Sequence, residues 1–191
     1  RENVRLMPEF APAHGNLGVL FARRGQWHEA IASYQRALRF GSQYPRIHYN
    51  LGLAFVQIGD PSTAITHYRR ALELRPTYAD VHIAIGIALS QQGKLEQAAR
   101  EFEAEIQLHP NSHEAHNYLG HLYLLRKEIG PARRALEAAI RVLEESPRFE
   151  VVRISYPGYS RSIEQILYGL FLLGRAGEPG LVYKVLSKLL P

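Results

Sequence analysis

Histidine is the residue type in this sequence whose spacing could support chemistry. Imidazole nitrogens bind zinc, and two histidines three positions apart share one face of a helix, as His113 and His116 would. These two belong to a local group of histidines: His109, His113, His116 and His121. The group is a candidate metal site, with packing between helices as the alternative.

A longer spacing favours the packing role. Histidines also recur at a step of 34 residues, at His14, His48, His82 and His116. If each step is one structural unit, equivalent residues lie one helix-packing distance apart, ~8–10 Å, whereas zinc holds its ligands at ~2 Å. The series therefore cannot be one metal site. We interpret its members as side chains that pack between helices, and we expect no bound metal.

No other pattern in the sequence predicts catalysis. It contains no G-x-S-x-G, P-loop, G-x-G-x-x-G or H-E-x-x-H motif. It also contains no cysteine, which excludes disulfides, thiolate zinc sites and a cysteine nucleophile. We therefore expect a non-catalytic chain with no catalytic residues and no cofactor.

Composition is that of a folded, soluble domain. The chain has 191 residues, of which 46% are hydrophobic and 21% charged. No apolar run approaches the ~18 residues that span a bilayer, and the start carries no signal-peptide pattern. The net charge is +5, but the arginines are dispersed in pairs along the chain, so we interpret them as solvated faces and expect no nucleic-acid partner. Arginine-rich usage also fits a G+C-rich bacterial gene, and both a cytoplasmic and a periplasmic location stay open.

The elements that carry these residues are repeated. Glycines stand at a step of 34 residues, at Gly18, Gly52, Gly86 and Gly120. A glycine inside a helix costs about 1 kcal/mol relative to alanine, so its recurrence indicates close approach of a partner helix. Small residues follow each glycine at a fixed offset and would supply the matching face: Ala30, Ala64, Ala98 and Ala132. A fixed period of this length predicts an array of helix pairs rather than one closed globule.

This pattern resembles the tetratricopeptide repeat (TPR) family, whose motif is W-x2-L-G-x2-Y…A-x3-F…P. The resemblance covers four repeats, 11–44, 45–78, 79–112 and 113–146, with histidine where the motif has tryptophan. Lys127 stands where a turn glycine is expected, and Gly130-Pro131 follows. The resemblance implies an all-α, right-handed superhelix, an α-solenoid of antiparallel helix pairs.

The two ends depart from the period. Residues 1–10 align with the end of a repeat, so we interpret them as the tail of a preceding repeat or a linker, in a chain excised or processed from a longer protein. Residues 147–160 read as an irregular insertion, either a spacer or a segment that folds over the groove. Residues 161–191 read as a degenerate helical pair that caps the array, and its apolar content makes it a candidate surface for self-association.

The resemblance also implies where a partner binds. In TPR arrays the first helix of each pair lines a concave groove. The side chains expected there are Asn16, Val19, Arg23, Tyr49, Asn50, Leu53, Val56, Gln57, Ile83, Ile87, Gln91, Asn117, His121 and Leu124. Several are aliphatic, so the groove floor is expected to be apolar, unless these residues pack against the second helices as core.

Two family modes bear on the partner. Asn16 and Asn50 resemble two rungs of the asparagine ladder of O-GlcNAc transferase TPR regions, and an amide both donates to and accepts from a peptide backbone. The next two repeats have no asparagine at the equivalent position. Some TPR domains bind the carboxylates at the C-terminus of a partner with lysines in the groove, an arrangement that we call an acidic-tail clamp. We do not expect this mode here, because the positions of those lysines hold Gly15, Tyr49, Ile83 and Asn117.

We therefore predict a non-catalytic scaffold that binds a peptide or helical segment of a partner protein in an apolar concave groove. The alternative is the substrate-recruiting TPR arm of a larger enzyme, such as a glycosyltransferase.

The repeat register predicts how the chain tolerates deletion. Removing residues 45–78 keeps the 34-residue period and should leave a cooperatively folded helical protein, because each unit is stabilised by its neighbours. Removing half of that segment should not. Thermal melts followed by circular dichroism compare the two, and equal melting temperatures would show that the register is wrong.

Overall fold

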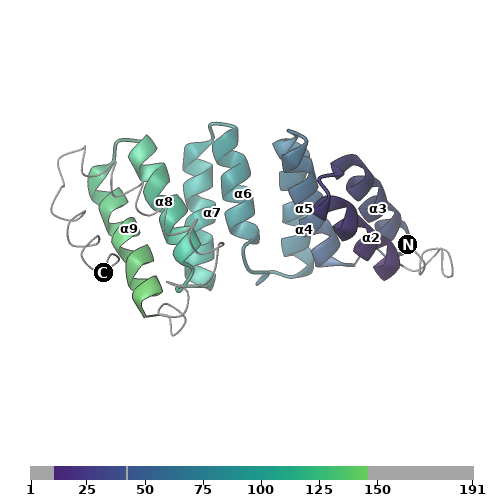
Figure 1. Ribbon diagram of the computed structural model, residues 1–191. Coiled ribbons are helices and arrows are strands. Elements are labelled where there is room, and N and C mark those ends of the chain that lie inside the picture. Colours follow the sequence, from purple (N-terminus) through teal and green to yellow (C-terminus); the bar gives the residue numbers. More distant parts are fainter. Residues whose placement is uncertain (1–10, 42, 146–191) are drawn as a thin grey trace. The chain divides into compact units, whose positions relative to one another are not determined.

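The computed structural model describes residues 11–41 and 43–145, which form α-helices and no strand (Figure 1). The helices are α2 (Ala11–Arg23), α3 (Trp27–Phe40), α4 (Pro45–Gln57), α5 (Pro61–Leu74), α6 (Val81–Gln91), α7 (Leu95–Leu108), α8 (His113–Leu125) and α9 (Ile129–Glu144). The predicted all-α architecture is confirmed. The interpretations of residues 1–10, 147–160 and 161–191 lie outside the described residues.

The chain divides into two compact units. Unit 1 runs to Glu101 and unit 2 starts at Phe102, so the boundary falls within α7. In unit 1, α2 packs on α3 and α4 on α5 as antiparallel pairs, while α3 also packs on α4 and α5 on α6. In unit 2, α8 packs on α9 in the same way.

Glycines and one N-capping aspartate mark the turns between the helices. Gly25, Gly59 and Gly93 lie at φ of 71°, 82° and 74°, a region that favours glycine because other residues carry a Cβ. Lys127 takes the equivalent place at φ 60°, which costs a non-glycine residue about 1 kcal/mol or more. Asp60 caps α5, its Oδ1 accepting a hydrogen bond of 3.0 Å from the Thr63 amide.

The repeated glycines mark the closest contact between paired helices. The phenol ring of Tyr34 lies against Gly18, and that of Tyr68 lies against Gly52, where an added Cβ would overlap the ring. At Gly120 the added atom would come within 2.7 Å of the Leu136 Cγ. Close approach is confirmed, but the group over each of these glycines is the large residue of the second helix, not the alanine that the sequence suggested.

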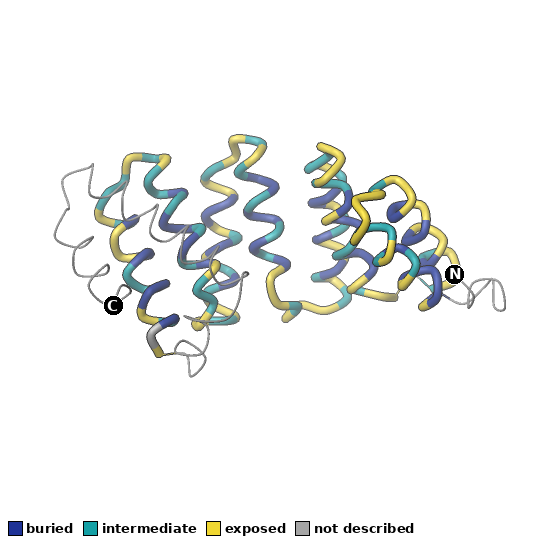
Figure 2. Tube along the Cα trace, in the orientation of Figure 1, coloured by how far each residue is buried: buried dark blue, intermediate teal, exposed yellow. Residues whose placement is uncertain are grey.

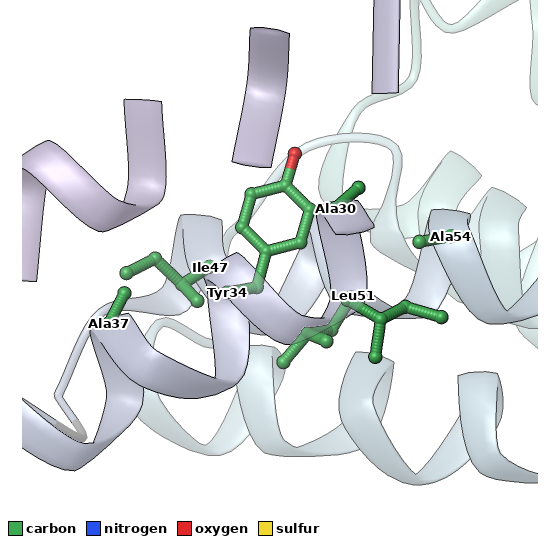
Figure 3. Close-up of a cluster of buried hydrophobic side chains, with 7 residues drawn as sticks. Ala30, Tyr34, Ala37, Ile47, Leu51 and Ala54 are labelled. Carbon is green, nitrogen blue, oxygen red and sulfur yellow. The ribbon is translucent and has the colours of Figure 1, made fainter. Parts of the chain in front are cut away.

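The repeated alanines of the second helices belong to the buried core beside the large side chain that covers each glycine. Ala30, Ala64, Ala98 and Ala132 are all fully buried. Figure 3 shows Tyr34 of α3 with Ala30 and Ala37 on its own helix and with Ile47, Leu51 and Ala54 of α4. This core joins the second helix of one repeat to the first helix of the next. Figure 2 shows that buried residues recur along each described helix of unit 1.

Two glycine substitutions test the ring contact. Gly52→Ala should lower the free energy of unfolding by about 1–2 kcal/mol, because the methyl group overlaps the Tyr68 ring and overpacking exceeds the gain in helix propensity. Gly15→Ala is the matched control: its Cβ would lie 3.5 Å from the Ile47 Cδ1, an ordinary contact, so stability should rise by up to about 1 kcal/mol. Urea unfolding measures both. Equal effects would contradict the assigned packing.

Candidate functional site

The exposed face of the first helices is a row of side chains that repeats with the 34-residue step. On each helix the row follows i, i+4, i+7 and i+11, one face of an α-helix. We call it the first-helix row, and none of its members is buried: Pro12, Asn16, Val19 and Arg23 on α2; Arg46, Asn50, Leu53 and Gln57 on α4; Ala84, Ile87 and Gln91 on α6; Glu114, Tyr118, His121 and Leu125 on α8.

Most of the predicted groove residues belong to this row. Among the rest, Val56 and Leu124 are half-buried beside it. Ile83 and Asn117 are only 6% and 2% exposed, so they are core residues and not groove residues in the free chain. Both stand one position before the row, in the column that also holds Gly15 and Tyr49.

That column faces inward. Gly15 is buried, and the Tyr49 ring packs on Tyr68 and Tyr78 with centroids 5.8 and 5.5 Å apart. One residue of an α-helix turns the side chain by about 100°, which separates this column from the row. Three of the four positions that argued against an acidic-tail clamp are therefore buried and Tyr49 is half-buried, so the row sets the charge of the exposed face.

A hollow of about 140 Å³ opens between α2 and α4 at one end of the row. The predicted residues Val19 and Asn50 line it. The residues that the sequence analysis did not assign to it are Pro12, Gly15, Tyr44, Arg46 and Ile47. Gly15 was the signal in the sequence that could have predicted this hollow. It is a helical glycine outside the repeated glycine position, and its missing side chain leaves space beside Ile47.

Arg46 and Tyr44 line this hollow, and the charge of Arg46 also acts on two tyrosines that do not line it. Burial raises the pKa of the Tyr34 hydroxyl, and the Arg46 guanidinium opposes that increase. Burial likewise raises the pKa of Tyr78, while Arg46 and Arg75 lower it and Asp80 raises it further. The Arg75 guanidinium lies 5.4 Å from the centre of the Tyr78 ring, a cation–π contact. The hollow can hold an aliphatic side chain, with the Asn50 amide and the Arg46 cation at its edge.

Three histidines of the 34-residue series contact the second helix of their own repeat, as the packing interpretation predicts, whereas His116 does not make this contact. His48 Nδ1 and His67 Nδ1 are 3.2 Å apart, so one ring donates and the other accepts. His82 Nδ1 lies 2.8 Å from the Glu101 carboxylate at the same sequence separation of 19 residues. His14 stacks on Phe40, with ring centroids 5.7 Å apart.

The local histidine group does not converge on one point. His109 Nδ1 lies 2.8 Å from the buried Glu105 carboxylate, His113 Nδ1 lies 3.1 Å from Glu114, and His116 Nε2 lies 3.2 Å from the Pro110 carbonyl oxygen. Within residues 11–41 and 43–145, no three His, Cys, Asp or Glu side chains are grouped to hold a metal ion. Over the same residues, no helix is both long enough and apolar enough to cross a membrane.

Antiparallel helix pairs with a 34-residue step and an exposed first-helix row define the class of helical-repeat proteins. Family signatures are more specific: the TPR repeat signature matches residues 18–59 and 52–93, and the tetratricopeptide repeat signature matches residues 83–148. The matches extend over more than half of the sequence. The chain belongs to the tetratricopeptide repeat family.

Solved structures share the fold. MamA superposes with a TM-score of 0.72 at 22% identity, over 75% of this chain and 84% of MamA. YrrB, described as a TPR protein with an unusual peptide-binding site, has a TM-score of 0.64 at 25% identity, over 74% and 73%. The first TPR of Spaghetti (RPAP3), bound to an HSP90 peptide, has a TM-score of 0.59 at 24% identity, over 61% and 93%. Among curated protein sequences none matches the chain.

The His48–His67 contact predicts how stability depends on pH. Burial lowers the pKa of His67 from its ordinary value of 6.5, and the neighbouring His48 lowers it further. Above pH 6.5 His67 is neutral in both the folded and the unfolded chain, so its contribution to stability is complete. As the pH falls below 6.5 the unfolded chain takes up the proton first, and the free energy of unfolding should decrease.

The variant His67→Gln should reduce this loss, and His28→Gln, at an exposed position on α3, is the matched control. Urea unfolding at pH 7.5 and pH 5 measures the difference. If His67→Gln loses as much stability on acidification as the wild type, the pKa of His67 does not contribute to it.

Proposed function

We propose that this chain is a non-catalytic scaffold that binds an extended or helical peptide segment of a partner protein along the part of the first-helix row that lies in unit 1. TPR repeats are typically modules for protein or peptide interaction, and two of the structural neighbours are described as peptide-binding or peptide-bound. The observation that carries the proposal is the hollow between α2 and α4 together with the exposed Leu53, which stands about one turn along α4 from the lining residue Asn50.

Leu53 is the apolar centre of the proposed surface. It is 39% exposed although it stands on a helix whose other apolar residues are mostly buried. Ile87 occupies the equivalent place on α6 and is half-buried. Burying a side chain of this size contributes about 1.5–3 kcal/mol, so a partner that covers both positions gains most of its affinity there.

Polar members of the row would orient the partner. Asn16 and Asn50 stand one turn before Val19 and Leu53. An amide can donate to a peptide carbonyl and accept from a peptide amide, so this pair suits a backbone without specifying its sequence. Ala84 replaces the amide on α6, which would limit this backbone contact to α2 and α4.

The double variant Leu53→Asp with Ile87→Asp should weaken partner binding at least about tenfold, because it places two carboxylates in an apolar contact. Affinity capture from a native extract, with the captured protein then titrated by calorimetry, compares it with wild type. Leu108→Asp is the matched control, since Leu108 is 44% exposed but lies outside the row. A double variant that unfolds would show that Leu53 and Ile87 are core residues, and one that binds normally would exclude this surface.

Salt supplies an independent test of the same proposal. Apolar burial is not screened by ions, whereas charge contacts at the surface are. Raising the salt concentration from about 0.05 to 0.3 M should therefore change the affinity only a few-fold. A steep loss would instead identify the arginines as the main contacts and an acidic partner.

A further inference from the structure

A second hollow, of about 420 Å³, lies in unit 2 on the opposite side of α8 from the first-helix row. Its walls come from three helices. Its lining includes Glu103, His116, Leu119, Arg134, Ala135 and Ala138. His116 and Leu119 stand about half a turn around α8 from Tyr118 and His121, so this hollow and the row are separate surfaces.

The hollow lies where the second helix of this repeat has two alanines, at the places that hold His67 and Arg70 in the second repeat. The first repeat has the small residue Ser33 at the place of Ala135. Ala135 stands 34 positions after Glu101 and 68 after His67, the residues that contact His82 and His48. A methyl group cannot make that contact, and His116 instead lies beside the Pro110 carbonyl oxygen. Ala138 occupies the place of Arg36 and Arg70, which is an alanine in the third repeat as well.

Helix packing elsewhere in this repeat is intact. Ala132, Leu136 and Ala139 are fully buried, and Tyr118 stacks on Phe102 with ring centroids 5.6 Å apart. The hollow is therefore not a general packing fault. Its floor is apolar, formed by Leu119 and Ala135, which are 7% and 8% exposed.

The walls of the hollow carry opposite charges. On the α7 side Glu103 is exposed, and one of its carboxylate oxygens accepts a hydrogen bond of 3.2 Å from the Tyr123 hydroxyl. No lysine or arginine occurs between Phe102 and Leu125, so this side is acidic. On the α9 side the lining cation is Arg134, which is exposed. The hollow thus has the volume of an ordinary ligand pocket, an apolar floor and two oppositely charged walls. These features indicate which side chains a partner would place in it.

We infer that this hollow is a second peptide-docking site, which takes a leucine-sized side chain flanked by one basic and one acidic side chain of a partner protein. The basic side chain faces Glu103 and the acidic one faces Arg134. Charge selects the segment and its direction, and the apolar anchor supplies the affinity.

The test uses the full chain and short acetylated, amidated, dye-labelled peptides with the core Lys-Ala-Leu-Ala-Glu, followed by fluorescence anisotropy. Comparison peptides replace both charged residues by Lys, by Glu or by Gln, and a fourth replaces Leu by Ala. The mixed-charge peptide should bind roughly two- to fivefold tighter than each of the three charge variants, because rim charges contribute modestly. The Ala peptide should bind at least about tenfold more weakly.

Substitutions in the protein locate the site. Ala138→Leu fills the hollow and should weaken binding of the mixed-charge peptide at least about tenfold. Arg134→Glu makes both walls acidic, so the two-lysine peptide should become the preferred ligand; Arg133→Glu is the matched control, with the same change of charge on an exposed residue outside the lining. Leu53→Asp in unit 1 should leave this binding unchanged, which separates it from the proposed function.

Arg134→Glu keeps the inference testable even if Ala138→Leu fails to fold in a thermal melt. The inference is overturned if wild type prefers none of the four charge patterns, if a folded Ala138→Leu chain binds normally, or if Arg134→Glu and Arg133→Glu give the same peptide preference.

Discussion

The packing of a large second-helix side chain against a first-helix glycine is the contact on which the described structure depends. Tyr34 on Gly18 and Tyr68 on Gly52 bring paired helices as close as a ring permits, and Leu136 does so at Gly120. Because a ring seated on a glycine fixes the rotation of both helices, it also decides which side chains of the first helix face inward. The exposed row is what remains on the other side.

This constraint explains why neighbouring positions on one helix have different roles. Asn50 and Leu53 lie in the row, while Tyr49 turns inward to Tyr68 and Tyr78. The step of 34 residues transfers the same division to the next repeat, where Ala84 and Ile87 stand in the row and Ile83 is buried. A binding surface of this kind is a consequence of core packing, since no separate element positions it.

The fold was predictable from the sequence because its signals are local and repeated. The recurring glycines, the turn glycines and the Asp60 cap each have a direct physical meaning, and all are seen in the structure. The site was less predictable. Residues Val81–Gln91 are apolar on nearly every side, so their sequence does not reveal which face is buried, and Ile83 was assigned to the groove although it is core. The position of Arg46 at the edge of the hollow between α2 and α4 depends on how one repeat packs on the next, which the repeat motif does not encode.

Positions outside the ring contact are where the repeats diverge. The residue that faces the first-helix histidine is His67 in one repeat and Glu101 in the next, and the equivalent place in the fourth is Ala135. The alanine that precedes the ring or its aliphatic replacement is fully buried in every repeat, at Ala30, Ala64, Ala98 and Ala132. A repeat can therefore have a small side chain at this place and still keep the contact that holds its helices together, as Leu136 on Gly120 does in the fourth repeat. The same packing that makes the array regular thus allows each repeat to present a different surface.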